Sequence, residues 1–581
     1  MIPLPQSALL KWIPAVEALR GYTRADARAD LVAGITVATV AVPQAMAYAL
    51  LAGVPPEYGL YTAIVMTAVG ALFDSSRQLI NGPTNAISIA VLSALAGIAA
   101  TEDRIAAAVM LALMVGSIQV GITLFRLGDL TRYVSHSVII GFTVGASALL
   151  ALDQLKNLLG LQAMGDAHDH FLVRFWHTMT LGGPIHPETL AVGVGTIGIV
   201  VLLRMIKHRL GWTLFPELFA TVVLMAVLVA WLDLDQVGVR VVGEIPPRLP
   251  SFHAPVLDLA RMRELAPSAV AIALAIAMAK AIAARTGQKL DMNQQCLSEG
   301  LANVAGSLFH CIPGSGSLTR SAINQQAGGR TQWSGVISAF AVAAIVLLFA
   351  SYARFIPRSA LAGILFVASW RMIDWHALRY HLRASRFDAG IVIATAVAAV
   401  AISVEFCVLI GILLSFLLAV PRAGRMLLTE FVLTEDRVIH ERMGTEEIDP
   451  RILLFGFEGE FFFGSAVAFE HHLDAIEARV RPETRYIVLR LKRVRSPDAV
   501  CMTMLDGFVT RMEERGVHVL MCGVRPELYE ALERIGTLAR HRDQIFVEQT
   551  VRNTSTLMAV KAAYDGLGGK HERAEGMYYM I

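Results

Sequence analysis

Charged residues are scarce in this chain. They make up 17% of its 581 residues, whereas soluble domains usually carry about a quarter. A single soluble core also stops growing well below this length. Because the chain has too little charge to keep so large a surface in water, and because 55% of it is hydrophobic, much of it must be solvated by lipid.

Cysteine and net charge are also low. The five cysteines show neither the paired spacing of a metal site nor an even-numbered disulfide framework, so we expect no metal and interpret them as small buried thiols. A net charge of +2 is too small to indicate a nucleic-acid partner. Residues 1–30 lack the apolar core of a signal peptide.

A catalytic constellation is missing as well. The sequence contains no nucleophile–base pattern and no phosphate-binding loop. His310 and Cys311 are adjacent, but two neighbouring residues cannot form a metal site without distant ligands. We therefore expect that the protein is not an enzyme and has no catalytic residues and no cofactor.

What the sequence has instead is a series of apolar runs. A helix needs about 20 residues to cross a bilayer, and several of these runs are shorter. The fourteen runs are residues 31–50, 60–72, 84–100, 106–125, 134–155, 190–205, 214–232, 267–284, 296–309, 317–326, 334–351, 359–372, 389–403 and 406–420.

The placement of Lys and Arg gives an independent test of this count. Basic residues follow the even-numbered runs, for example Arg77 after the second, Lys207 after the sixth and Arg330 after the tenth. The short loop 53–58, on the other side, has none, although two long loops carry some. The pattern predicts a multi-pass protein of the bacterial inner membrane with both termini in the cytoplasm.

The composition changes after Val420. A charged stretch is followed by alternating strand and helix patterns, which are typical of a small α/β domain. We expect strands at residues 452–457, 486–491 and 518–522, and helices at 466–480, 499–514 and 526–535. The predicted division is a cytoplasmic N-terminal segment (1–29), a transmembrane transport domain (30–421), a linker (422–436), the α/β domain (437–565) and a C-terminal tail (566–581).

Two short segments interrupt apolar surroundings with glycine and proline. They are residues 81–88 (NGPTNAIS) and 313–321 (PGSGSLTRS), in the third and tenth runs. These positions correspond if the chain consists of two halves of seven runs. Broken helices at corresponding places in two halves indicate the central site of a transporter.

The chemistry of these segments favours an anion. A helix that begins inside the membrane has unpaired N–H groups and a partial positive charge at its N-terminus, and two such ends can bind a negative ion. Thr84, Ser317 and Thr319 add hydroxyl groups, and Arg320 adds a positive charge where an unpaired charge is costly. The alternative is a pair of ordinary glycine kinks, with Arg320 reaching to a membrane interface.

Several motifs then resemble one family. They are residues 42–49 (VPQAMAYA), 53–61 (GVPPEYGLY), Gly82-Pro83, 136–141 (HSVIIG), 154–157 (QLKN), 291–295 (DMNQQ) and 328–331 (GGRT). In this order they resemble the SulP family of anion transporters, whose animal relatives include prestin and pendrin. The C-terminal domain resembles the STAS domain that ends most members.

The resemblance implies seven-plus-seven inverted repeats with a core and a gate domain, a homodimer, and an anion bound between the third and tenth helices. In it, Gln44 would supply an amide donor and Tyr48 an aromatic wall, unless the two are simply a packed pair in the bundle interior. The residues that the family motifs place at the site are Gln44, Tyr48, Thr84, Ser317, Leu318, Thr319 and Arg320.

The sequence departs from the family at the eighth run. Many members carry a carboxylate six residues before the lysine that is Lys280 here, and this position is Leu274. The carboxylate is tied to cation or proton coupling, so its absence favours exchange or uncoupled movement. Glu405, between the last two runs, could be a substitute, but we interpret it as a loop or interface residue.

A second departure lies in the STAS-like domain. Relatives that act as phosphorylation switches have a hydroxyl residue shortly after an aspartate at a helix start. Here Asp498-Ala499 is followed by Val500, and Ser496 is the nearest hydroxyl. We therefore expect Asp498 to cap a helix and expect no phosphoregulation at this position.

The sequence thus predicts a secondary transporter of chloride, bicarbonate, sulfate or a small dicarboxylate, working by alternating access in a lipid bilayer. A membrane anion sensor or scaffold that signals through the STAS domain is the alternative. Helix ends and hydroxyl groups bind monovalent and divalent anions alike, so the sequence does not choose the substrate.

Overall fold

The chain forms two compact units, Met1–Ser415 and Phe416–Ile581. This computed structural model describes residues 13–98, 100–126, 135–165, 169–212, 215–283, 291–433, 438–443, 449–536, 541–548, 554–568 and 578–579. The division between the units falls inside the helix α17 (Val404–Ala423). The five-part domain division expected from the sequence stays a prediction.

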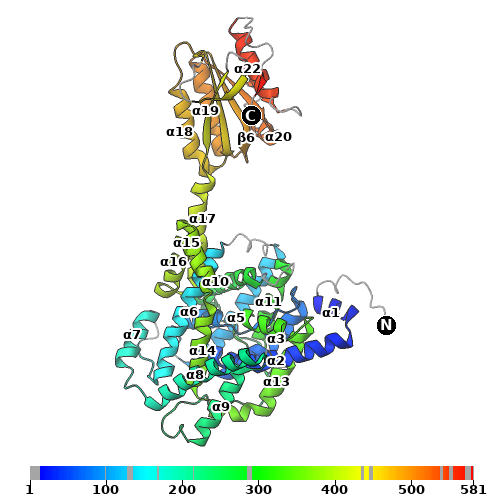
Figure 1. Ribbon diagram of the computed structural model, residues 1–581, viewed down its shortest axis with the longest axis vertical. Coiled ribbons are helices and arrows are strands. Elements are labelled where there is room, and N and C mark those ends of the chain that lie inside the picture. Colours follow the sequence, from blue (N-terminus) through cyan, green and yellow to red (C-terminus); the bar gives the residue numbers. More distant parts are fainter. Residues whose placement is uncertain are drawn as a thin grey trace. The chain divides into compact units, whose positions relative to one another are not determined.

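Each of the first seven apolar runs contains one helix of the first unit (Figure 1). A short helical start, α1 (Pro14–Ala18) and η2 (Leu19–Gly21), precedes them. An additional helix that the sequence did not predict, α7 (Phe171–Leu181), lies between the fifth and sixth. The seven helices are α2 (Arg24–Leu51), α3 (Pro56–Phe73), α4 (Asn85–Ala94), α5 (Thr101–Leu124), α6 (His136–Leu159), α8 (Pro187–Leu210) and α9 (Glu217–Trp231).

Each of the second seven runs also corresponds to one helix. A second unpredicted helix, α15 (Trp375–Ala384), occurs after the twelfth run. The seven helices are α10 (Leu259–Ala283), α11 (Met292–Ser307), α12 (Leu318–Gln326), α13 (Trp333–Phe349, continued by η5, Ala350–Phe355), α14 (Arg358–Met372), α16 (Arg386–Ala401) and α17.

Some of these helices are long enough to cross a membrane and others are too short. Six of the described helices are long and apolar enough to cross a bilayer: α2, α5, α6, α8, the α13–η5 rod and residues Phe406–Ala423 of α17. In contrast, α4 has 10 residues and α12 has 9, so each spans only about 15 Å at 1.5 Å per residue. The third and tenth runs are therefore half-helices, as the sequence predicted.

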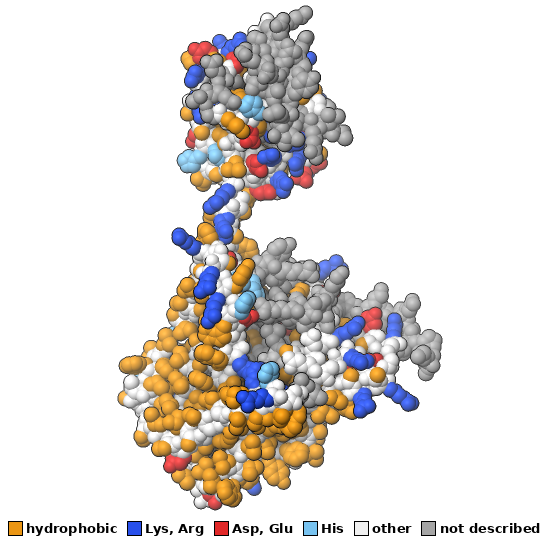
Figure 2. Space-filling model, in the orientation of Figure 1, with side chains coloured by type: hydrophobic (Ala, Val, Ile, Leu, Met, Phe, Trp, Pro, Cys, Tyr) orange, Lys and Arg blue, Asp and Glu red, His pale blue; other side chains and the backbone are white. Residues whose placement is uncertain are grey.

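The helices of the first unit pack in two groups. In one, α5 and α11 pack together, as do α2 with α13 and α3 with both α11 and α13. In the other, α6 packs against α14 and α16, and α8 packs against α14. Hydrophobic side chains cover much of the visible surface of this unit (Figure 2), and large ones such as Trp231 and Phe340 are exposed. Such a surface suits lipid.

The second unit is a mixed sheet flanked by helices (Figure 1). Its strand order is β8-β7-β6-β5-β3-β4-β9, with β5 to β8 parallel. All six elements expected from the sequence are confirmed. The strands are β3 (Leu427–Leu433), β4 (Val438–Glu441), β5 (Ile452–Glu460), β6 (Tyr486–Arg495), β7 (His518–Val524), β8 (Ile545–Val547) and β9 (Tyr578–Tyr579). The helices are η6 (Phe463–Ser465), α18 (Ala466–Glu477), α19 (Ala499–Glu514), α20 (Pro526–Arg534), η7 (Arg542–Gln544) and α22 (Thr554–Gly566).

Alternation along β6 divides the core of this unit between the two faces of the sheet, since successive strand residues point to opposite sides. Ile487 and Leu489 join the cluster that includes Phe469 of α18 and Phe508 of α19. Val488 joins the cluster that includes α22. The sheet is thus covered on both faces.

The start of α19 confirms the expected cap. The Asp498 carboxylate accepts a hydrogen bond from the Cys501 N–H at 3.0 Å. Ser496, the nearest hydroxyl, has a left-handed backbone with φ 52°. All five cysteines are buried, and burial raises the pKa of the Cys522 thiol to about 12, which fits their interpretation as inert thiols.

Candidate functional site

The two interrupted segments meet in a small antiparallel pairing. Strand β1 (Asn81–Gly82) pairs with β2 (Ser315–Gly316), with Gly82 opposite Ser315. The Ser317 N–H also donates to the Ile80 carbonyl at 2.8 Å. Since α4 and α12 begin within three residues of these strands, the pairing brings their N-terminal ends together.

Glycine is required on both sides of this pairing. Gly82 has φ 142°, and a Cβ on it would lie 2.8 Å from Nη1 of Arg320. A Cβ on Gly314 would lie 2.6 Å from the Gly82 carbonyl oxygen. The glycines that made these segments conspicuous in the sequence therefore permit a close approach of backbone to backbone and of backbone to guanidinium.

Buried polar groups hold β1 from behind. The Asn81 amide donates to the Asp74 carboxylate at 2.8 Å, and the Thr67 hydroxyl donates to the Asn81 carbonyl at 2.6 Å. Asp74 also accepts from Gln295 at 2.7 Å and from Ser298. These contacts join α3 and α11 to the pairing, and they satisfy groups that would be costly to bury alone.

A second set holds β2. The Asn303 side chain accepts from the Gly314 N–H at 3.0 Å and donates to the Gly314 carbonyl at 3.1 Å. The Glu299 carboxylate accepts from the Gly316 N–H at 3.2 Å. Glu299 and Asn303 are fully buried and lie one turn apart on α11, so that helix fixes the position of β2.

A cavity of about 350 Å³ lies at the helix ends. Its walls come from α2, α4, β2 and α12 on one side and from α6, α14 and the start of α15 on the other. Five of the seven residues predicted for the site line it: Gln44, Tyr48, Thr84, Ser317 and Thr319. We call it the central cavity.

Several polar groups at the central cavity have no partner within the described part of the chain. Gln44 is 4% exposed, and its Oε1 accepts no hydrogen bond from any described group. The Thr84 hydroxyl contacts the Ser315 hydroxyl at 3.0 Å but does not cap α4. The first-turn N–H groups of α4, including that of Ala86 at the cavity wall, therefore lack a side-chain acceptor.

Arg320 lies behind the wall of this cavity. Its side chain is fully buried and does not line the cavity. Its Nη2 donates to the Pro83 carbonyl at 2.8 Å, while Nε and Nη1 find no acceptor among the described residues. Full burial excludes the alternative in which Arg320 reaches an interface. Its positive charge acts on the cavity through the start of α4.

The remaining predicted positions are less informative. The side chains of Leu318, Lys280 and Glu405 lie outside the described part of the chain, although the Glu405 backbone belongs to α17 rather than to a loop. Leu274 is half-buried within α10. Sequence reasoning did not name Asp74, Glu299, Asn303 or Ser315 as site residues. The available signals were the polar residues Glu299 and Asn303 inside the ninth apolar run and the position of Ser315 within the segment 313–321, whereas Asp74 lies outside the apolar runs.

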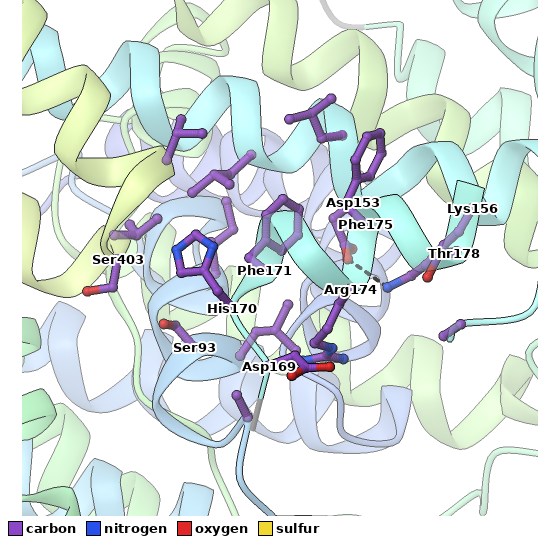
Figure 3. Close-up of a pocket in the computed structure, with 18 of the residues that line it drawn as sticks. Ser93, Asp153, Lys156, Asp169, His170, Phe171, Arg174, Phe175, Thr178 and Ser403 are labelled. Carbon is purple, nitrogen blue, oxygen red and sulfur yellow. Dashed lines mark hydrogen bonds and ion pairs between the residues drawn. The ribbon is translucent and has the colours of Figure 1, made fainter. Parts of the chain in front are cut away.

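A second cavity, of about 240 Å³, lies at the other end of α4 (Figure 3). Ser93 near the C-terminal end of α4 borders it, as do α6, α7 and the start of α17. Asp153 and Lys156 form an ion pair across its wall at 2.6 Å, and Arg174 of α7 points into the same space. The short helix α4 therefore separates two cavities.

Comparisons with known proteins agree with this architecture. A family model for the sulfate permease family matches residues 28–395, and one for the STAS domain matches residues 445–552. YvdB of Bacillus subtilis (strain 168) is 30% identical over 536 residues, covering 91% of this chain and 97% of that protein. Sulfate transporter 4.1 of Arabidopsis thaliana is 34% identical over 70% of this chain and 60% of its own length. The sodium-independent sulfate anion transporter of Bos taurus is 30% identical over 65% and 67%.

Two solved structures share the fold. The structure of SLC26A9 superposes with a TM-score of 0.85 at 19% identity, covering 97% of this chain and 95% of that one. The transmembrane domain of a cyanobacterium bicarbonate transporter, BicA, has a TM-score of 0.57 at 25% identity, covering 68% and 98%.

Proposed function

The chain belongs to the sulfate permease family, and from that premise we propose that it is a secondary transporter that carries a small anion by alternating access. The candidate substrates are chloride, bicarbonate, sulfate and small dicarboxylates. The relatives named for sulfate and bicarbonate transport support an anion as cargo, and the multi-pass helical unit supports a membrane location.

The observation that carries the proposal is the convergence of two half-helix ends on one cavity. The positive ends of the α4 and α12 dipoles attract an anion. The open first turn of α4, the Thr84 hydroxyl and the Gln44 amide offer hydrogen bonds there. Arg320 adds a full positive charge behind the wall. A small anion would bind between Thr84 and Thr319.

The arrangement of the cavities supports alternating access. The central cavity borders the N-terminal end of α4 and the second cavity borders its C-terminal end. Both have walls from the two helix groups, with α2 from one group and α6 from the other. Movement of one group against the other would close one cavity and open the other around a site at the half-helix ends.

We propose exchange or uncoupled movement rather than sodium coupling. Leu274 cannot bind a cation. Within the described residues, Asp374 is the carboxylate that lines the central cavity, and it accepts from the Ala377 N–H at the start of α15. A bovine relative is named for sodium-independent sulfate transport. The proposal includes a homodimer in the bacterial inner membrane with both termini in the cytoplasm.

The test is uptake by proteoliposomes that contain only this protein. Radiolabelled sulfate, chloride, bicarbonate and fumarate would each be offered with and without a proton or sodium gradient. Saturable uptake of one anion that the cation gradients leave unchanged is the expected result. Uptake driven by a gradient would disprove the coupling proposal. No flux of any anion, in protein that binds one, would leave the sensor or scaffold alternative in place of transport.

A further inference from the structure

A third cavity, of about 310 Å³, adjoins the central cavity. It lies where α2, α8, α12 and α14 meet the start of α9, and it shares Leu218, Thr319 and Arg371 with the central cavity. Figure 2 shows a gathering of Lys and Arg side chains with a histidine on this otherwise largely hydrophobic unit. The charged and titratable residues that line the third cavity are Arg204, Lys207, His208, Glu217 and Arg371.

One of these positive charges is balanced within the protein. The Lys207 ammonium group donates to the Glu217 carboxylate at 2.7 Å and to the Phe215 carbonyl at 2.8 Å. Both side chains of this ion pair are largely buried. Lys207 and Glu217 therefore form a closed pair that contributes little net charge to the cavity.

The two arginines are not balanced in this way. Neither Arg204 nor Arg371 forms an ion pair or a side-chain hydrogen bond with any described residue. Their guanidinium groups are close enough for their charges to interact unfavourably, and Glu217, the carboxylate near them, already binds Lys207. Both side chains are exposed and line the third cavity, so an anion bound between them would relieve the repulsion of their like charges.

The chemistry of the pair selects the anion. A guanidinium group presents a planar fork of N–H donors that matches two oxygens of a carboxylate, sulfate or phosphate group. Two forks on different helices, α8 and α14, can bind different edges of one tetrahedral oxyanion. A monovalent spherical ion such as chloride would use fewer donors and neutralise one charge instead of two.

We propose that Arg204 and Arg371 form a second anion site, for a tetrahedral oxyanion such as sulfate or a phosphate group, next to the central site. Because Arg371 and Thr319 line both cavities, an oxyanion bound there is positioned to enter the central cavity. This loading role rests on the proposed function, whereas binding at the two arginines does not. The oxyanion can be a free ion or the phosphate of an anionic lipid headgroup.

The test is equilibrium binding of radiolabelled sulfate to the full-length protein in nanodiscs of phosphatidylcholine. Wild-type protein should bind two sulfate ions. The double variant Arg204→Gln/Arg371→Gln should lose one of them, and Thr84→Val should weaken binding of the other about fivefold. Each single glutamine variant should weaken the second site about tenfold, as expected for a lost charge-assisted hydrogen bond. Arg371→Lys, which keeps the charge without the fork, should retain part of the affinity.

Arg209→Gln is the matched control. It removes a positive charge from the last turn of the same helix, and Arg209 is exposed and does not line the third cavity. An equal loss of sulfate binding in this variant would show that the loss depends on net charge alone, and it would overturn the proposal. Elution as a single species and an unchanged unfolding temperature confirm that each variant is folded.

The source of the oxyanion is separated by adding phosphatidylglycerol to the nanodiscs. If phosphatidylglycerol prevents binding of the second sulfate ion to wild-type protein, and if it binds to wild-type protein but not to the double variant, the site takes a headgroup phosphate. If sulfate binding is unaffected, the site takes the free ion. A single sulfate ion that the double variant retains, with no difference in lipid binding, would overturn the second site. That outcome leaves the proposed function intact, because uptake of the four candidate anions by proteoliposomes tests the proposed function separately.

Discussion

The two half-helices occupy corresponding places in the two halves of the chain, but their N-terminal ends are capped differently. The first turn of α4 has an N-cap, Thr84, whose side chain caps nothing. The N-cap of α12, Ser317, accepts a hydrogen bond from the Arg320 N–H. The guanidinium group of Arg320, in the polar helix α12, donates to the Pro83 carbonyl just before α4. The first turn of α4 is thus uncapped by its N-cap side chain, whereas the first turn of α12 is capped and its Arg320 contacts the chain before α4.

The largest effect should come from removing the charge. Arg320→Ala takes away the donor to the Pro83 carbonyl and the positive charge behind α4, and should lower anion uptake about ten- to a hundredfold. The measurement is the initial uptake rate in proteoliposomes. Arg209→Ala, an exposed arginine on α8, is the control. Wild-type uptake by Arg320→Ala would show that α12 provides no charge to the site.

Filling the space between the two ends should have the next largest effect. Gly82→Ala would place a methyl group 2.8 Å from Nη1 of Arg320 at φ 142°, and strain of this kind costs about 1–3 kcal/mol. We expect uptake to fall about tenfold and the unfolding temperature to drop. Gly121→Ala on α5, where nothing lies within 4 Å of the added atom, should behave as wild type. Equal behaviour of the two variants would contradict the close approach of the helix ends.

Removing one hydroxyl group at a time should distinguish the roles of the two helix ends. Thr84→Val removes a donor at the open end, at a cost of about 0.5–1.5 kcal/mol, and should raise the KM for the anion about fivefold without unfolding the protein. Thr319→Val should weaken uptake to a smaller degree, because the other end relies on charge. Uptake kinetics over a range of anion concentrations measure both. If Thr319→Val has the larger effect, the assignment of the open end to α4 is wrong.

The smallest effect on uptake is expected at the satisfied cap. Ser317→Ala removes the acceptor for the Arg320 N–H, so it should lower the free energy of unfolding by about 1 kcal/mol, with uptake reduced in proportion to the folded fraction. Thermal unfolding followed by intrinsic fluorescence measures the loss. A large fall in uptake with unchanged stability would mean that the Ser317 hydroxyl binds the anion directly.

Much of this architecture could be predicted from local sequence. Glycine and proline in apolar surroundings marked both half-helices, and strand patterns that alternate with helix patterns marked the second unit. Gln44, Tyr48 and Thr84, which the family motifs place at the anion site, line the central cavity, and their binding of an anion stays a prediction. The half-helices and the elements of the second unit depend on residues that are near neighbours in the chain, so they can be predicted without a structure.

Other features depend on distant pairing and could not be predicted. Arg320 lies behind the cavity wall because the register of β1 on β2 directs it to Pro83. Asp74 and Gln295 meet although 221 positions separate them. Arg371 lies near Arg204 because α14 packs against α8, and the sequence alone does not show that packing.

The pairing of β1 with β2 also has a consequence for biogenesis. Gly82 and Ser315 join the two ends of a long stretch of chain, and synthesis proceeds from the N-terminus. Until the tenth run has entered the bilayer, the β1 backbone groups that pair with β2 lack these partners in a medium where each unpaired group is costly. The start of α4 therefore reaches its final structure only after the second half of the chain has been inserted.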